Sequence, residues 1–142
     1  MSEQNAVLFA NEAFYLAFAD RNIKVMESVW AENKSVSCIH PGWQTLLGLQ
    51  EVMESWSSIL SNPDSPDVTC RAQRAAIYGD MAIVTCVEEI SSRDQEAEFL
   101  TATNVFVKAG SVWVMVHHHA GPVHLDSDFL EEEEDDTPQP IN

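Results

Sequence analysis

The main change in the hydrophobic repeat of this chain falls at Pro66, and that change restricts the folds it can adopt. Before Pro66 apolar residues mostly recur every three or four positions, and after it they follow the two-residue period of a strand. Short turns divide the second part, and we predict strands over 68–78, 81–90, 96–108 and 111–119. Because short turns join antiparallel neighbours, these strands should form a meander.

The first part of the chain predicts three helices and one strand. The apolar spacing places the helices over 5–20, 23–30 and 49–60. A short alternating segment, 35–40, predicts a strand that ends at the turn Pro41-Gly42. Helices kept separate from a run of strands indicate the α+β class. We expect a helical hairpin and a third helix on one face of a curved, mainly antiparallel sheet.

The predicted last strand is apolar on both sides. Alternate residues of a strand point in opposite directions, which puts on one side Trp113, Met115, His117 and His119. The other side carries Val112, Val114, Val116 and His118. Helices of the same chain can cover one side, and a soluble monomer rarely exposes an apolar patch as large as the other. We therefore predict a homodimer that forms through the sheet.

The charge of the chain disfavours two classes of partner. There are 23 Asp and Glu residues against 7 Lys and Arg, a formal net charge of −16, and the basic residues form no cluster. Nucleic acids and anionic membrane surfaces need clustered basic residues, so we expect neither as a partner. One acidic run spans 131–136, and we predict a domain over 1–124 followed by a solvated acidic tail over 125–142.

The cysteines and the apolar runs bear on location. Cys38, Cys70 and Cys86 are odd in number and widely spaced, which is typical of unpaired thiols in a reducing compartment. No apolar run reaches the roughly 20 residues of a membrane span. The N-terminal residues lack the basic and apolar regions of a secretory signal. We expect a cytoplasmic protein.

Several short motifs resemble those of a known superfamily. They are Thr103-Asn104-Val105-Phe106, then Gly110 and Trp113, then the run Val116-His117-His118-His119-Ala120-Gly121-Pro122. Together they resemble the end of the association (hub) domain of calcium/calmodulin-dependent protein kinase II, and equally SnoaL-like proteins. Both belong to the nuclear-transport-factor-2-like superfamily. The loop His40-Pro41-Gly42-Trp43 and Gly48 also fit, so the resemblance spans about 6–122.

The resemblance implies a cone-shaped α+β barrel with a pocket inside the cone and dimers through the sheet. Members of the superfamily include isomerases, cyclases, dehydratases, binding proteins and oligomerisation modules, so the fold does not determine the function. Two positions depart from the kinase hub, which has arginines where this chain has Asn104 and Ala120. The carboxylate-binding pocket of the hub is therefore not implied here. The chain also has no kinase or calmodulin-binding segment, so a signalling-hub role is not implied either.

The expected pocket combines aromatic residues with a few polar ones. As pocket-lining residues we predict Trp30, His40, Trp43, Trp56, Asn104, Trp113, His117 and His119. An imidazole and an indole at the His40–Trp43 loop could hold a flat apolar ligand with one polar group. The loop could equally be only a turn, with Trp43 packed on another tryptophan. Asn104 would bond to a ligand or to a nearby histidine.

Catalytic candidates are His40, His117 and His119, whose imidazoles could act as general acid or base. They could instead make only structural hydrogen bonds at the strand end or the dimer interface. Three imidazoles are enough for a metal, but no acidic ligand follows the histidine run closely, and we expect no metal and no cofactor. The glutamates 88, 89, 96 and 98 lie near a predicted turn and are interpreted as solvated. Since neither Tyr15 nor Tyr78 is next to a strand-borne acid, no isomerase-type base can be nominated.

Three functions remain open from the sequence. The first is a homodimeric, SnoaL-like protein that binds a small molecule in its pocket. The second is an isomerase, cyclase or dehydratase that uses pocket histidines as general acid and base. The third is a homo-oligomerisation module that resembles the kinase association domain.

Overall fold

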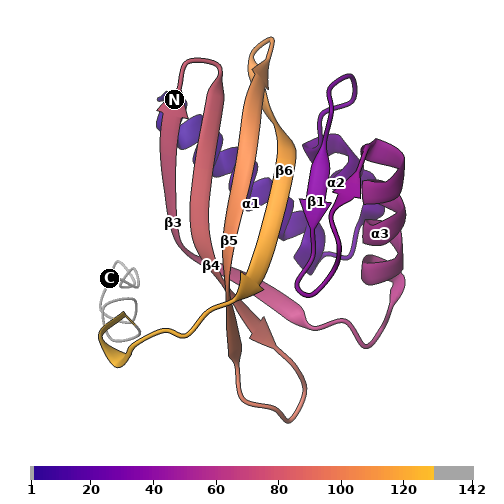
Figure 1. The fold of residues 1–142 in the computed structure, drawn as a ribbon, viewed down its shortest axis with the longest axis vertical. Helices are drawn as coiled ribbons and strands as arrows, with labels where there is room; N and C mark the ends of the chain where they lie inside the picture. The colour runs from indigo at the N-terminus through magenta and orange to yellow at the C-terminus, as the bar shows by residue number, and fades with distance from the viewer. Residues whose placement is uncertain (1, 130–142) are drawn as a thin grey trace, which may run out of the picture.

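The computed structural model describes residues 2–129, and it has three helices on a curled six-stranded sheet (Figure 1). Helix α1 (Glu3–Ala19) and helix α2 (Ile23–Val29) form the predicted hairpin. The Ser2 side chain caps α1 by accepting from the Asn5 N–H, and Asn22 caps α2 in the same way. Helix α3 (Leu49–Ser61) follows Gly48, whose φ of 90° suits glycine.

Four long strands form the meander that the two-residue period predicts. They are β3 (Asp67–Tyr78), β4 (Met81–Ser91), β5 (Glu98–Ala109) and β6 (Val112–Pro122). Two short strands, β1 (Ser37–Ile39) and β2 (Leu46–Leu47), extend the sheet, whose order is β2-β1-β6-β5-β4-β3. The α+β class and the curved, mainly antiparallel sheet are confirmed. The sheet is curled and does not close into a barrel.

Two features of the sheet were not expected from the sequence. Strand β2 was not predicted, and β1 pairs with β6 in parallel while every other pair is antiparallel. The parallel pair is possible because α2 and the chain that follows it carry β1 to the far side of β6. It places His40, which follows β1, near the C-terminal end of β6.

One β-bulge decides which side chains of β6 point inward. Met115 pairs with Phe106 and His117 pairs with Val105, so Val116 is an extra residue in β6. Alternation continues beyond it with the opposite parity. The predicted grouping of Trp113 and Met115 with His117 and His119 on one side is therefore wrong. His118 takes the inward direction and is only 2% exposed.

The helices cover one face of the sheet and leave the other open. Helix α1 crosses behind β3–β6 in Figure 1, while α2 and α3 lie beside β1 and β2. The core between α1, α3 and the sheet contains large side chains, among them Phe14, Trp30, Trp56, Phe106 and Met115. Among residues 2–129, no helix has the length and apolar character needed to cross a membrane. Most of the predicted acidic tail, 130–142, lies outside the described residues.

Candidate functional site

The core beneath α1 contains a cluster of polar side chains in place of the apolar residues that usually fill such a space. The inward faces of three adjacent strands supply Glu88 from β4, Asn104 from β5 and His118 from β6. Asn104 lies opposite His118 in the β5–β6 register. Helix α1 adds Asn11 and Tyr15, which are one turn apart on its buried face. All five residues are at most 5% exposed.

Hydrogen bonds join the members of this cluster. The Tyr15 hydroxyl donates to Glu88 Oε2 at 2.7 Å, and Asn104 Nδ2 donates to the Tyr15 hydroxyl oxygen at 3.2 Å. Asn104 Nδ2 also donates to Asn11 Oδ1 at 2.8 Å, while Nδ1 of His118 lies 2.6 Å from Asn104 Oδ1. Nε2 of His118 lies 3.9 Å from Glu88 Oε2. That separation is too long for a hydrogen bond, so these two atoms face each other unbonded.

Burial favours the neutral forms of both titratable groups at this point. Loss of hydration raises the pKa of Glu88 to about 7, although the hydrogen bond from Tyr15 acts in the opposite direction. Burial lowers the pKa of His118 far below its ordinary value, and the positive charges of other histidines would lower it further. Near neutral pH the imidazole of His118 is therefore neutral, and the Glu88 carboxyl that faces it is about half protonated.

His40 lies next to the cluster, in an aromatic group. Its ring contacts Trp56, with 4.8 Å between the centroids, and Trp43, with 4.9 Å. The Ser55 hydroxyl donates to the carbonyl of Val52, so it can only accept from His40 Nε2, 2.8 Å away. His40 therefore carries its proton on Nε2, and burial lowers its pKa to about 4.

Two buried tryptophans have indole N–H groups with no hydrogen-bond partner in the described structure. They are Trp30 and Trp56, both at most 1% exposed. The ring of Trp56 contacts Phe14 and His40 and lies 5.9 Å from the ring of His118. An unpaired buried donor is costly, so an acceptor atom placed beside Trp56 would be bound favourably.

Comparison with known proteins identifies the family. Residues 7–123 match the SnoaL-like domain family. The chain belongs to this family.

Three relatives that are 31–33% identical to this chain carry different functional assignments. An NTF2-like protein from Streptomyces avermitilis, provisionally assigned as a dehydratase, is 33% identical with a TM-score of 0.79, over 87% of this chain and 97% of that one. A protein from Thiobacillus denitrificans, provisionally assigned as a calcium/calmodulin-dependent protein kinase type II association domain, is 32% identical with a TM-score of 0.73, over 81% and 93%. The F-box protein SKIP8 from Arabidopsis thaliana is 31% identical over 85% of this chain. The chain spans about half the length of SKIP8.

The SnoaL-like domain places some of the predicted pocket residues together and separates others. Asn104 belongs to the polar cluster, and the rings of His40 and Trp56 lie beside that of His118. Trp43 contacts the His40 ring but is 48% exposed. Trp30 is buried at the end of α2. Trp113 is buried at the start of β6, and its indole N–H donates to Glu3 at 3.0 Å, away from the cluster.

His117 and His119 project from the open face of the sheet. Nδ1 of His117 lies 2.6 Å from the Ser37 hydroxyl, and burial together with the neighbouring His119 lowers the His117 pKa. His119 is exposed. In the described part of the chain, no group of three or more His, Cys, Asp or Glu side chains is arranged to hold a metal ion.

Four members of the cluster were not predicted from the sequence: Asn11, Tyr15, Glu88 and His118. The prediction that Glu88 is solvated is wrong, because Glu88 is 3% exposed and accepts a hydrogen bond from Tyr15. His118 was assigned to the wrong side of β6. One available signal was that Glu88 continues the inward alternation of Ala82, Val84 and Cys86. No local pattern could show that Tyr15 reaches it, 73 residues away.

A large polar cleft of about 730 Å³ lies elsewhere in this SnoaL-like domain. Its lining includes Arg21, Arg93 and the loop that connects α3 to β3, and it contains no member of the cluster. The Arg21 guanidinium already donates to the carbonyls of Asn62 and Ser65 in that loop. Arg21 therefore attaches this loop to the rest of the fold. We do not assign the functional site to this cleft.

Proposed function

We propose that this SnoaL-like domain binds a small, mainly apolar molecule in its interior, beside Glu88, His118, Trp56 and His40. The observation that carries the proposal is the burial of seven polar side chains in the core of one small domain, each at most 7% exposed: Asn11, Tyr15, His40, Ser55, Glu88, Asn104 and His118. Apolar residues of similar volume would usually be at least as stable there. Retention of a buried acid beside two imidazoles is typical of a functional site.

The chemistry of the interior indicates the kind of ligand. The buried residues include the aromatic rings of Phe14 and Trp56, and they include no Lys or Arg within 2–129. A carboxylate ligand would face Glu88 with no cation to balance it. An uncharged, flat molecule with one oxygen fits better, because the oxygen can accept from the unpaired Trp56 N–H.

Three matched naphthalenes test this proposal. We expect 2-naphthol to bind the purified full chain in isothermal titration calorimetry, and 2-naphthoate to bind at least ten-fold more weakly. Trp56→Phe should weaken 2-naphthol binding about five-fold, the loss of one hydrogen bond. Trp113→Phe is the control, because that indole bonds to Glu3 away from the site. Equal binding of naphthol, naphthoate and uncharged naphthalene, or equal loss in both variants, would contradict the proposal.

A second candidate function is catalysis in the same site. It is supported by the Glu88 carboxyl, whose pKa of about 7 suits a general acid near neutral pH, and by the neutral imidazole that faces it. In this reading His118 and Glu88 replace His117 and His119 as the candidate acid and base. The relative provisionally assigned as a dehydratase is compatible with this candidate.

We also propose that the domain forms a homodimer through the open face of its sheet and acts in the cytoplasm. The open face is lined by apolar side chains that no helix covers, including Ile83, Val105, Val107 and Val114. A relative provisionally assigned as an association domain supports self-association. The three cysteines are free thiols, which fits a reducing compartment.

A further inference from the structure

A chain of hydrogen bonds runs from the surface of α1 into the buried cluster, and its direction is set at the outer end. Glu12 is exposed, and its carboxylate oxygens only accept. Gln73 Nε2 donates to Glu12 Oε1 at 2.8 Å, which turns the Gln73 carbonyl oxygen toward the interior. That oxygen accepts from Asn11 Nδ2 at 3.0 Å.

The same direction continues to His118. Since the NH₂ group of Asn11 donates to Gln73, the side-chain oxygen of Asn11 faces inward and accepts from Asn104 Nδ2 at 2.8 Å. Asn104 in turn presents its oxygen to Nδ1 of His118 at 2.6 Å. An amide oxygen cannot donate, so Nδ1 of His118 must carry the hydrogen.

With the hydrogen on Nδ1, the Nε2 atom of His118 is unprotonated and has a free lone pair. Nε2 faces Glu88 Oε2 across 3.9 Å, and that oxygen also accepts from Tyr15. The side-chain amide of Asn104 cannot easily exchange the positions of its oxygen and nitrogen, because its NH₂ group also donates to the Tyr15 hydroxyl. His40, the nearby imidazole, has the opposite tautomer, since its Nε2 donates to Ser55.

We propose that Asn104 is a positioning residue that holds His118 in the Nδ1–H tautomer, so that Nε2 of His118 and the carboxyl of Glu88 form the base and the acid of one proton-transfer site. In such a step the Glu88 O–H bond breaks as one atom of the bound molecule gains that proton. Nε2 takes a proton from a second atom of the same molecule. Transfer from Nε2–H back to the Glu88 carboxylate then restores both groups, and no oxidant or second substrate is needed.

The test is the tautomer of His118 in the unliganded full chain, measured by long-range ¹H–¹⁵N correlation NMR with ¹⁵N-labelled histidine. We expect protonated Nδ1 and unprotonated Nε2 for His118 at neutral pH, and the reverse for His40. Asn104→Leu removes the acceptor and should shift His118 toward the Nε2–H form by at least ten-fold in the tautomer ratio. Asn104→Asp should keep Nδ1–H and make His118 titrate at a higher pH than in the wild type.

The wild-type spectrum decides the proposal even if Asn104→Leu fails to fold. An Nε2–H tautomer for His118 in the wild type would overturn it. So would an unchanged tautomer ratio in a folded Asn104→Leu variant, because a purely structural asparagine would leave the imidazole proton where it was. The proposal extends the binding function proposed above, but the measurement needs no ligand. Failure of 2-naphthol to bind and failure of the tautomer assignment are therefore separate results.

Discussion

Glu88 and Glu89 are adjacent residues of one strand with opposite surroundings. Glu88 points into the core and accepts from Tyr15, whereas Glu89 points to the open face and binds Arg71 at 2.8 Å. The side chain of Glu89 keeps 21% of its surface exposed. The difference follows from strand alternation alone, and it gives Glu88 a chemistry that Glu89 lacks.

Stability should depend on pH through Glu88. Its pKa rises from 4.5 to about 7 on folding, so the native state keeps a proton that the unfolded chain loses. The contribution of this proton is complete below pH 4.5 and is lost as pH rises through 7. Glu88→Gln removes the titration, and we expect its stability relative to the wild type to improve by roughly 3 kcal/mol between pH 4.5 and pH 8. Urea unfolding across this range measures the change.

Two comparisons separate this effect from others. His40 and His118 have lowered pKa values, so they destabilise the protein as pH falls below their ordinary value of 6.5, but they do so in both proteins. Glu89→Gln is the matched control and should show no comparable gain at high pH. A stability difference between Glu88→Gln and the wild type that stays constant with pH would show that Glu88 titrates normally.

Of the two bulges in the sheet, the one in β6 has the larger effect on which side chains enter the core. The extra residue, Val116, leaves Trp113 and Met115 inward and then brings His118 inward as well. Without it, strict alternation would bring His117 and His119 into the core and leave His118 on the open face. A second bulge, between Arg71 and Arg74 of β3, places Gln73 within reach of Asn11 on α1.

Chemical labelling can test the side-chain directions along β6. Diethyl pyrocarbonate modifies accessible imidazoles, and peptide mass spectrometry reports each site. We expect His119 and His124, both exposed, to react at least ten times faster than His118 and His40, which are 2% and 4% exposed. Brief labelling of the native chain limits the reaction to accessible side chains, and a urea-unfolded sample shows the intrinsic rates. Equal native rates at His118 and His119 would contradict the bulge.

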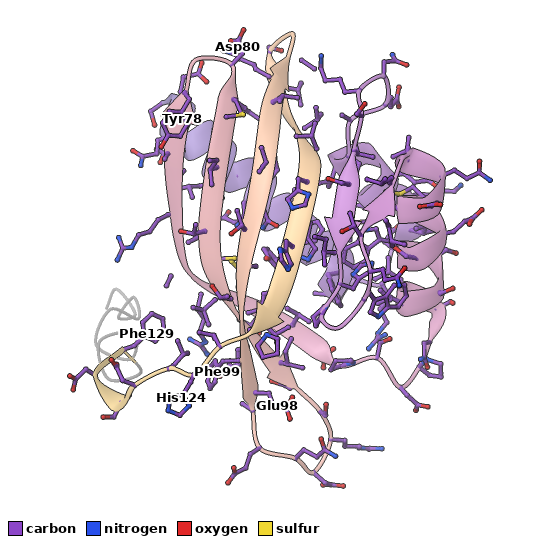
Figure 2. All side chains as sticks on the ribbon, viewed as in Figure 1. Tyr78, Asp80, Glu98, Phe99, His124 and Phe129 are labelled. Carbon is purple, nitrogen blue, oxygen red and sulfur yellow. The ribbon has the colours of Figure 1, made fainter. Side chains whose placement is uncertain are left out.

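At the scale of the whole molecule, one face of the sheet has no partner in the single chain. Figure 2 shows Tyr78 at the β3–β4 turn and Phe99 at the opposite end of the sheet. Between them Ile83 lies beside Val105, and Val105 lies beside His117, in the strand register. The opposite face is covered by α1 and contains the polar cluster. Self-association and ligand binding would therefore use different faces of the same sheet.

A charge placed on the open face should prevent self-association. We expect the wild type to have the mass of a dimer in native mass spectrometry and light scattering. Val105→Glu should have the mass of a monomer with an unchanged circular dichroism spectrum, because a buried unpaired charge at an interface is costly. The control is Phe9→Glu, at a side chain of α1 that is 63% exposed outside this face. A monomeric wild type, or a Val105→Glu variant that remains dimeric, would refute this interface.

The sequence by itself determined the class of fold, because the periods of 3.6 and 2 are local properties of the chain. The three helices and four long strands begin and end within a few residues of their predicted positions. The short motifs around Asn104 and Trp113 also pointed to the family that the match over 7–123 shows. Charge and composition disfavoured some classes of partner but pointed to no ligand.

Only the tertiary structure decided which polar residues meet. Val116 has no partner in the β5–β6 register, so it interrupts the alternation of β6, and no local pattern in the sequence predicts this. Glu88 is an ordinary strand residue until Tyr15 and His118, each distant in sequence, enclose it. Burial and pKa depend on such contacts between distant segments. A single sequence records which residues are available for them, whereas the folded chain decides which of them come together.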